Sequence, residues 1–201
     1  MAKYLLDPAN AITAAALGLG VLGIYLGLTG RPELGIAAAL GAFLADHVDG
    51  VVAKRTAGRS QHTREIGRNL DSLADLVCEC LFPGLILLVV NDYALSSLAI
   101  ATASIIVGAL RLSYYNTFGA RDGYFVGVPV TYVVPALATV FLLSPLLGPG
   151  RLGLALNITF CILLLLHLSS IRIPVTKGWM YAPVVIFALG ASAALIGRGM
   201  S

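Results

Sequence analysis

Apolar runs of about twenty residues recur along this 201-residue chain and limit the folds that it can adopt. A helix needs about 20 mostly apolar residues to cross a bilayer, and backbone in lipid must satisfy its own hydrogen bonds. We expect seven such helices, separated by turn signals such as Gly30-Arg31-Pro32 and Gly148-Pro149-Gly150. They cover residues 11–29, 34–54, 69–90, 94–117, 126–147, 152–171 and 179–197.

The composition excludes an ordinary soluble domain. Hydrophobic residues make up 58% of the chain and charged residues 11%, whereas a soluble domain has roughly 25% charged residues. We therefore predict an all-α, polytopic transmembrane bundle of six to seven spans, formed by a single domain over residues 1–201, with no nucleic-acid partner. No small-residue cleavage site follows the first apolar run, so we expect no cleaved signal peptide.

Lysine and arginine are distributed unevenly between alternate ends of the expected helices. Ten lie on one side and three on the other, and the positive-inside rule assigns the richer side to the cytoplasm. The N-terminus is then cytoplasmic and, with seven spans, the C-terminus is outside. The ten are Lys3, Lys54, Arg55, Arg59, Arg64, Arg68, Arg111, Arg121, Arg172 and Lys177, and the three are Arg31, Arg151 and Arg198.

Four aspartates stand in a regular pattern at the end of the second run and the start of the third. Asp46 and Asp49 are three residues apart, and Asp71 and Asp75 are four apart. These spacings put each pair on one face of a helix. Consecutive helices joined by a loop are normally neighbours, so the two pairs should face each other at one depth, at the cytoplasmic end of the two spans.

Charged side chains in a bilayer need compensation, since each costs about 2.5–3.5 kcal/mol on insertion scales. Divalent metal is the compensation that suits carboxylates, because hard cations such as Mg²⁺ bind oxygen ligands. Two such ions also suit an in-line displacement at phosphorus. We predict that two Mg²⁺ or Mn²⁺ ions bind to Asp46, Asp49, Asp71 and Asp75.

The residues beside the aspartates favour a phosphate compound as the substrate. Gly50 removes a side chain where a diphosphate would approach the helix, and Ala53 keeps the same face narrow one turn further on. Lys54 and the arginine-rich loop after it supply cations for phosphate oxygens. The alternative of another class is a cation transporter, because intramembrane carboxylates also mark ion pathways. Against it, the acids gather at one end of the spans and no internal repeat is visible.

These residues resemble the signature of the CDP-alcohol phosphotransferases. The match runs from Asp46-x2-Asp49-Gly50-x2-Ala53 to Gly67-x3-Asp71-x3-Asp75, and Pro8-x-Asn10-x-x-Thr13 is similar to the family's entry into its first helix. The resemblance implies a homodimeric membrane transferase that joins a CDP-linked lipid to a small alcohol and releases CMP. The lipid is CDP-diacylglycerol or an archaeal CDP-ether lipid.

The resemblance also implies roles for individual residues. Asp46, Asp49 and Asp71 are metal ligands, and Asp75 both approaches a metal and acts as the general base. Two departures from the family stand out: Lys54 replaces an arginine, so Arg55 is a candidate to grip phosphate in its place, and the loop before Gly67 is about four residues longer. The implied CDP-lipid-binding residues are Asn10, Thr13, Asp49, Gly50, Ala53, Lys54, Arg55 and Gly67.

Further matches favour the phosphatidylserine synthase branch. They lie at residues 70–77, 109–116, 124–129 and 168–177. L-serine is therefore the first candidate acceptor, and ethanolamine, choline, inositol phosphate and glycerol 3-phosphate are the alternatives.

Glu79 is the main departure from that branch, which usually has Ser-Phe-Gly where this chain has Cys78-Glu79-Cys80. Glu79 follows Asp75 by four residues and extends the acidic face. Two roles are open: it binds the amino group of the acceptor, or it is paired with a basic neighbour such as Arg111. Arg111 and Arg172 are the candidate cations for an anionic acceptor.

Two histidines near the expected site have weaker claims to function. His47 lies between two of the aspartates but points off their face. His167 is expected to pack or to form a hydrogen bond with a neighbour.

Overall fold

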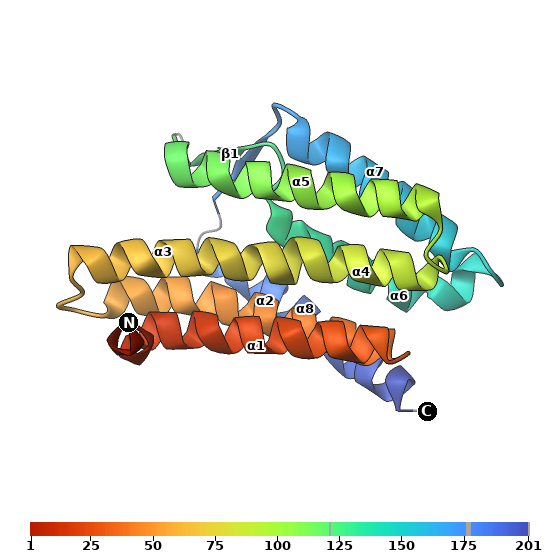
Figure 1. The fold of residues 1–201 in the computed structure, drawn as a ribbon, viewed down its shortest axis with the longest axis horizontal. Helices are drawn as coiled ribbons and strands as arrows, with labels where there is room; N and C mark the ends of the chain where they lie inside the picture. The colour runs from red at the N-terminus through yellow and green to blue at the C-terminus, as the bar shows by residue number, and fades with distance from the viewer. Residues whose placement is uncertain (121, 176–177, 201) are drawn as a thin grey trace.

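The structure, a computed structural model, describes residues 1–120, 122–175 and 178–200, so Arg121 and Lys177 of the charge pattern lie outside it. Long helices lie side by side in a bundle (Figure 1), which confirms the predicted all-α class. The helices are η1 (Ala2–Leu6), α1 (Pro8–Leu28), α2 (Pro32–Arg55), α3 (Gln61–Asp75), η2 (Leu76–Leu81), α4 (Phe82–Val90), α5 (Leu95–Phe118), η3 (Val130–Tyr132), α6 (Val133–Leu147), α7 (Leu152–Leu168), η4 (Gly178–Met180) and α8 (Tyr181–Gly199). Two short strands, β1 (Tyr124–Val126) and β2 (Arg172–Pro174), pair antiparallel.

Within the described residues, six helical segments are long and apolar enough to cross a membrane. The seventh expected run forms α7, whose 17 residues are at the lower limit for a span. The polytopic bundle of six to seven spans is thus confirmed. The six segments are Pro8–Leu28, Pro32–Arg55, Gln61–Val90, Leu95–Phe118, Val130–Leu147 and Gly178–Gly199.

Two helical segments begin at other residues than the expected spans. The third span begins at Gln61 rather than 69, because Ser60 caps the helix by accepting a hydrogen bond from the backbone N–H of Thr63 at 3.1 Å. The segment expected over 126–147 begins as a span at Val130. Residues 126–129 are not helical, because Val126 pairs with Arg172 in the sheet and Pro129 has no N–H to donate to a helix.

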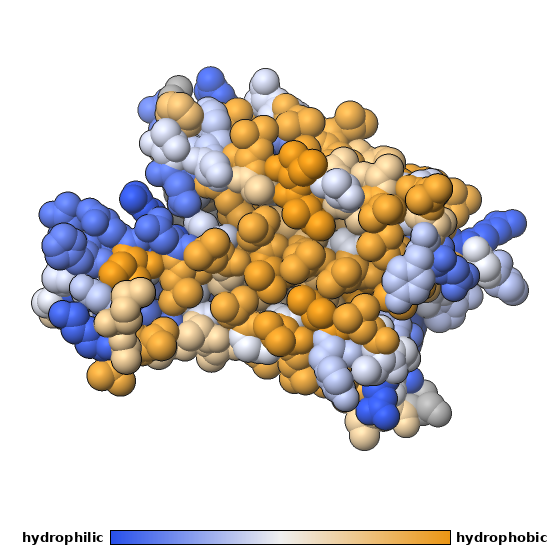
Figure 2. All heavy atoms as spheres, in the orientation of Figure 1, coloured by the Kyte–Doolittle hydropathy of each residue, from blue (hydrophilic) through white to orange (hydrophobic). Residues whose placement is uncertain are grey.

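The surface has the pattern of a membrane protein. Figure 2 shows a broad apolar band across the visible face, with polar residues gathered at its two ends. Large apolar side chains such as Leu154, Leu165 and Ile186 are exposed in this structure, as residues that face lipid must be. The N-terminus, the end of α2 and the start of α3 lie at the same end of the bundle (Figure 1).

The segment from α3 to α4 is one continuous rod interrupted by a π turn, η2. The turn ends two residues before Pro83, which has no N–H to donate to the carbonyl of Glu79 four residues earlier. Such π turns often occur at functional sites. Here the turn carries Glu79 one turn deeper than Asp75.

Helices α1 and α2 approach closely at two glycines. A methyl group on Gly35 would lie 2.7 Å from the carbonyl oxygen of Gly23 and 3.2 Å from the backbone nitrogen of Gly27. Small residues at such crossings let helix backbones touch in a bilayer. The contact keeps α1 against α2, and with it the polar residues that α1 brings to the aspartates.

We expect Gly35→Ala to destabilise the protein by about 1–3 kcal/mol, because the added methyl group meets backbone atoms that cannot move aside. Thermal unfolding of the purified protein in detergent measures the effect. Gly190→Ala is the matched control, since Gly190 is exposed in α8 and nothing lies within 4 Å of its added carbon. Equal unfolding temperatures for the two variants would contradict the close packing.

Candidate active site

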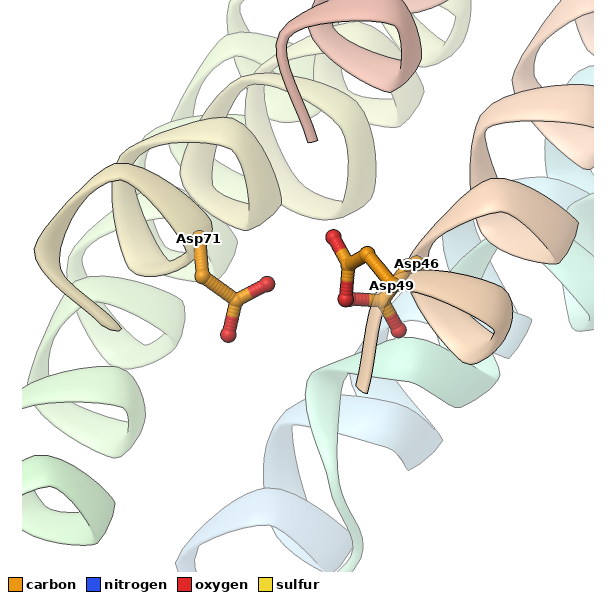
Figure 3. A group of neighbouring side chains, drawn as sticks. All are labelled: Asp46, Asp49 and Asp71. Carbon is orange, nitrogen blue, oxygen red and sulfur yellow. The ribbon is translucent and has the colours of Figure 1, made fainter. Parts of the chain in front are cut away.

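The predicted aspartates come together at the end of the bundle that holds the N-terminus. Asp46 and Asp49 on α2 face Asp71 on α3 (Figure 3). One carboxylate oxygen from each of the three lies within 4.8 Å of the others. The spacing of the aspartates explains the arrangement, since residues three apart share a helix face and α3 returns beside α2.

Asp75 lies one turn further along α3 and lines the same small cavity as the other three aspartates. The cavity has a volume of about 10 Å³. Alanines from α1, α2 and α3 narrow it, so the acidic groups are held among small apolar side chains. Its lining residues are Thr13, Ala16, Ala42, Asp46, Asp49, Asp71, Ala74, Asp75, Cys78 and Glu79.

The protein supplies little positive charge to these carboxylates. In the part of the chain that the structure describes, no lysine or arginine forms an ion pair with any of the four aspartates. Nδ1 of His47 lies 3.6 Å from Asp46 but also 2.9 Å from the carbonyl oxygen of Phe43, to which it donates. The hydroxyl of Thr13 donates to Asp49. A carboxylate cluster with no protein cation is the donor set that hard divalent ions prefer, so these residues fit the predicted metal.

A second cluster of polar side chains, which the sequence did not predict, joins the N-terminus to the loop before α3. Asp7 caps α1 by accepting from the backbone N–H of Asn10 at 3.1 Å. Arg59 donates to both carboxylate oxygens of Asp7, at 3.0 and 2.9 Å, and to Oδ1 of Asn10 at 3.0 Å. The longer loop is therefore folded back onto α1. The only sequence signal was an acid before Pro8 and an arginine far along the chain.

Gly67 and Gly50 are both glycines of the family signature, but they have different surroundings. A methyl group on Gly67 would lie 2.5 Å from Oδ1 of Asn10 and 3.0 Å from Nη2 of Arg59. Gly67 thus makes room for these protein side chains. A methyl group on Gly50 would meet nothing within 4 Å, and Gly50 is exposed beside Asp49. The described residues therefore give no packing reason for a glycine at position 50.

The cations expected to bind phosphate lie in the last turn of α2. Lys54 and Arg55 are exposed there and Ala53 is half-buried. Basic residues are favoured at the end of a helix, where carbonyl groups carry partial negative charge.

The three acceptor candidates are in different environments. Glu79 is buried and Arg172 is exposed in β2. Arg111, on α5, donates to the carbonyl oxygens of Val126 and, at 3.2 Å, Gly127. No ion pair joins Glu79 to a basic residue within the described ranges, so the interpretation of Glu79 as the partner of Arg111 is not supported.

Gly127 explains why residues 124–129 carry a recognisable pattern. It has a φ of +73°, which favours glycine. A side chain there would also lie 2.7 Å from the carbonyl oxygen of His167 and 2.8 Å from Nη1 of Arg111. The loop after α5, the end of α7 and Arg111 are thus packed as one unit.

The two histidines have structural contacts. The ring of His47 packs against Phe43 and Tyr181, with ring centroids 4.5 and 5.9 Å apart. Nδ1 of His167 lies 2.8 Å from the carbonyl oxygen of Val128, as expected for a hydrogen bond with a neighbour.

Fold and site together define an integral membrane protein with a cluster of carboxylates at one end of its bundle. The model of the CDP-alcohol phosphatidyltransferase family matches residues 7–189. The chain belongs to this family, as its aspartate signature predicted.

Similarity to curated proteins makes the family assignment more specific. The chain is 29% identical over 175 residues to a CDP-diacylglycerol–serine O-phosphatidyltransferase of Helicobacter pylori, covering 82% of this chain and 70% of the relative. It is 34% identical over 119 residues to the enzyme of that name in Bacillus subtilis, covering 57% of this chain and 64% of the relative. It is 27% identical over 124 residues to the archaetidylserine synthase of Methanothermobacter thermautotrophicus, covering 61% of this chain and 52% of the relative.

Proposed function

We propose that this protein transfers a phosphatidyl group from CDP-diacylglycerol, or the equivalent group from an archaeal CDP-ether lipid, to L-serine and releases CMP. The observation that carries the proposal is the cluster of Asp46, Asp49 and Asp71 within 4.8 Å, in a chain of the CDP-alcohol phosphatidyltransferase family. Relatives of bacterial and archaeal origin are named for serine as the acceptor, which supports serine over the other alcohols.

The aspartates have two roles in this proposal. Asp46, Asp49 and Asp71, with Asp75 at their inner side, hold two Mg²⁺ or Mn²⁺ ions. When bound, such ions neutralise the diphosphate and stabilise the charge that develops on the leaving group. Asp75 accepts the proton of the serine hydroxyl. The serine oxygen bonds to the lipid-side phosphorus, and the bond between that phosphorus and CMP breaks.

The CDP-lipid is bound by residues around the mouth of the site. Thr13 orients the Asp49 carboxylate through its hydrogen bond, and Asn10, held by Arg59, faces Gly67. Gly50 and Ala53 leave the face of α2 open to the diphosphate. Lys54 and Arg55 attract its phosphate oxygens, and the exposed Arg172 adds positive charge for an anionic acceptor as it approaches.

The orientation, the domain and the assembly follow from the same proposal. The end of the bundle with the aspartates and the N-terminus faces the cytoplasm, because ten of the thirteen lysines and arginines are expected on that side of the spans. Residues 1–201 form one catalytic domain, and the family resemblance indicates a homodimer.

We expect Gly50→Ala to unfold at the same or a higher temperature than the wild type, because alanine stabilises a helix interior by about 0.5–1 kcal/mol relative to glycine, and to raise the KM for CDP-lipid at least about tenfold. A methyl group at this position has no protein atom within 4 Å, so a rise in KM must come from crowding of the bound CDP-lipid. Overpacking of a contact costs about 1–3 kcal/mol. Initial rates of CMP release against CDP-lipid concentration measure it. Gly18→Ala, at an exposed glycine of α1 with equally open space, is the control; equal KM values for both variants would remove the ligand-binding role of Gly50.

The direct test is metal-dependent CMP release by the purified protein. CDP-diacylglycerol and a CDP-ether lipid are each supplied with Mg²⁺ or Mn²⁺ and one acceptor at a time: serine, ethanolamine, choline, inositol phosphate or glycerol 3-phosphate. Release with serine alone supports the whole proposal. Release with another acceptor alone would overturn serine while keeping the reaction, and no release from folded protein with any of them would overturn the transferase itself.

A further inference from the structure

The carboxylate of Glu79 is buried without full compensation. The residue is 2% exposed. The backbone amide of Val134, in the first turn of α6, lies near one oxygen of the carboxylate. The other oxygen, Oε2, has no hydrogen-bonding partner among the described residues. A buried acceptor left unpaired costs free energy, so a donor is expected there.

Glu79 separates two cavities. It lines the aspartate cavity and also a second cavity of about 10 Å³ on the side of α5 and α7. Such a volume suits a group of about the size of one water molecule. Besides Glu79, the second cavity has two polar side chains in its lining, Ser104 and His167.

All three polar side chains of this cavity can accept hydrogen bonds. Glu79 contributes a carboxylate and Ser104 a hydroxyl. Nδ1 of His167 faces the carbonyl oxygen of Val128, so Nδ1 carries the hydrogen and Nε2 is the acceptor in the neutral ring. An ammonium group has three N–H donors and a positive charge, which matches three acceptors of which one is anionic.

Arg111 lies at the same level on the neighbouring helix. Nδ2 of Asn116 donates to Oγ of Ser72 at 2.7 Å, and Gly108 packs against Sγ of Cys80. These two contacts give one antiparallel register, in which Arg111 lies level with the stretch between Asp75 and Glu79. Nε of Arg111 is the second buried side-chain polar atom in the described chain that lacks a partner.

We propose that Glu79 is the specificity-determining residue for the acceptor: its carboxylate binds the ammonium group of an amino acid whose carboxylate is bound by Arg111. The two unpartnered buried atoms have opposite charge, as the two ends of a zwitterion require. The acceptor hydroxyl then lies toward Asp75, on the aspartate side of Glu79. The inference rests on the proposed transfer to L-serine and names the residues that bind its two charged groups.

The test removes one partner of the proposed ion pair at a time, the carboxylate from the protein or the ammonium group from the acceptor. CMP release is measured with L-serine and with 3-hydroxypropionate, which lacks the ammonium group, for wild-type protein and Glu79→Gln. The wild type is expected to prefer serine in kcat/KM. In Glu79→Gln the KM for serine rises at least about tenfold, as expected for a lost hydrogen bond to a charged group, while the KM for CDP-lipid is unchanged. The ratio of kcat/KM for serine to kcat/KM for 3-hydroxypropionate then falls to nearly one.

Two controls separate recognition from structure. Glu33→Gln removes a carboxylate from the first turn of α2, at the end opposite the aspartates, and should keep wild-type kinetics. Glu79→Asp keeps the charge and should retain part of the preference for serine. An unchanged preference in Glu79→Gln overturns the proposal.

A measurement on the wild type covers the case in which Glu79→Gln does not fold. L-alanine, which has both charges but no hydroxyl, should inhibit CMP release at least about tenfold better than propionate or ethylamine, each of which lacks one charge. Equal inhibition by the three overturns the zwitterion site. The assay uses whichever alcohol the enzyme accepts, so a failure of serine as the acceptor is seen separately from a failure of this inference.

Discussion

Replacing Asp75 with asparagine is expected to lower the turnover number about 100- to 10,000-fold, the range that general-base catalysis contributes. Asparagine has nearly the same shape but accepts no proton at this oxygen. Asp75 lines the cavity beside the three clustered aspartates, so the variant should still bind CDP-lipid. The measurement is single-turnover CMP release, combined with equilibrium binding of CDP-lipid to the same sample.

Asp92→Asn is the matched control for this variant. Asp92 is exposed in the turn between α4 and α5, away from the site, and has a φ of +49°, which asparagine adopts readily. Normal turnover in Asp75→Asn would show that another group takes the proton. Loss of CDP-lipid binding together with turnover would instead show that Asp75 acts through its part in metal and substrate binding and not as the general base.

Asp46→Asn is expected to have an effect of similar size on metal affinity. Its carboxylate is one of three that lie within 4.8 Å of one another, and their mutual repulsion in the metal-free protein destabilises the fold. The variant should therefore unfold at a higher temperature than the wild type without metal. It should also lose most of the stabilisation that Mg²⁺ or Mn²⁺ provides by binding the folded state.

Thermal unfolding across a metal titration measures both effects without relying on activity. Asp92→Asn again serves as the control, because it removes one exposed carboxylate and should keep the wild-type response to metal. If Asp46→Asn shows the wild-type stabilisation by metal, Asp46 is not a ligand.

The sequence determined the class of fold and the meeting of the aspartates. Runs of about 20 apolar residues can only form spanning helices in lipid, and spacings of three and four place Asp46 with Asp49 and Asp71 with Asp75. Helical periodicity is a local property, so it can be read without knowing which helices touch. The family followed from the same residues, and the matched family model confirmed it.

Only the tertiary structure decided which side chains meet from distant parts of the chain. Arg59 reaches Asp7 across 52 positions, and Glu79 receives its neighbours from α5, α6 and α7. The two unpartnered atoms of Glu79 and Arg111 also depend on the packing of separate helices. A hydrogen bond between distant residues depends on distances of a few tenths of an ångström, and helix packing, rather than the periodicity within each helix, sets those distances.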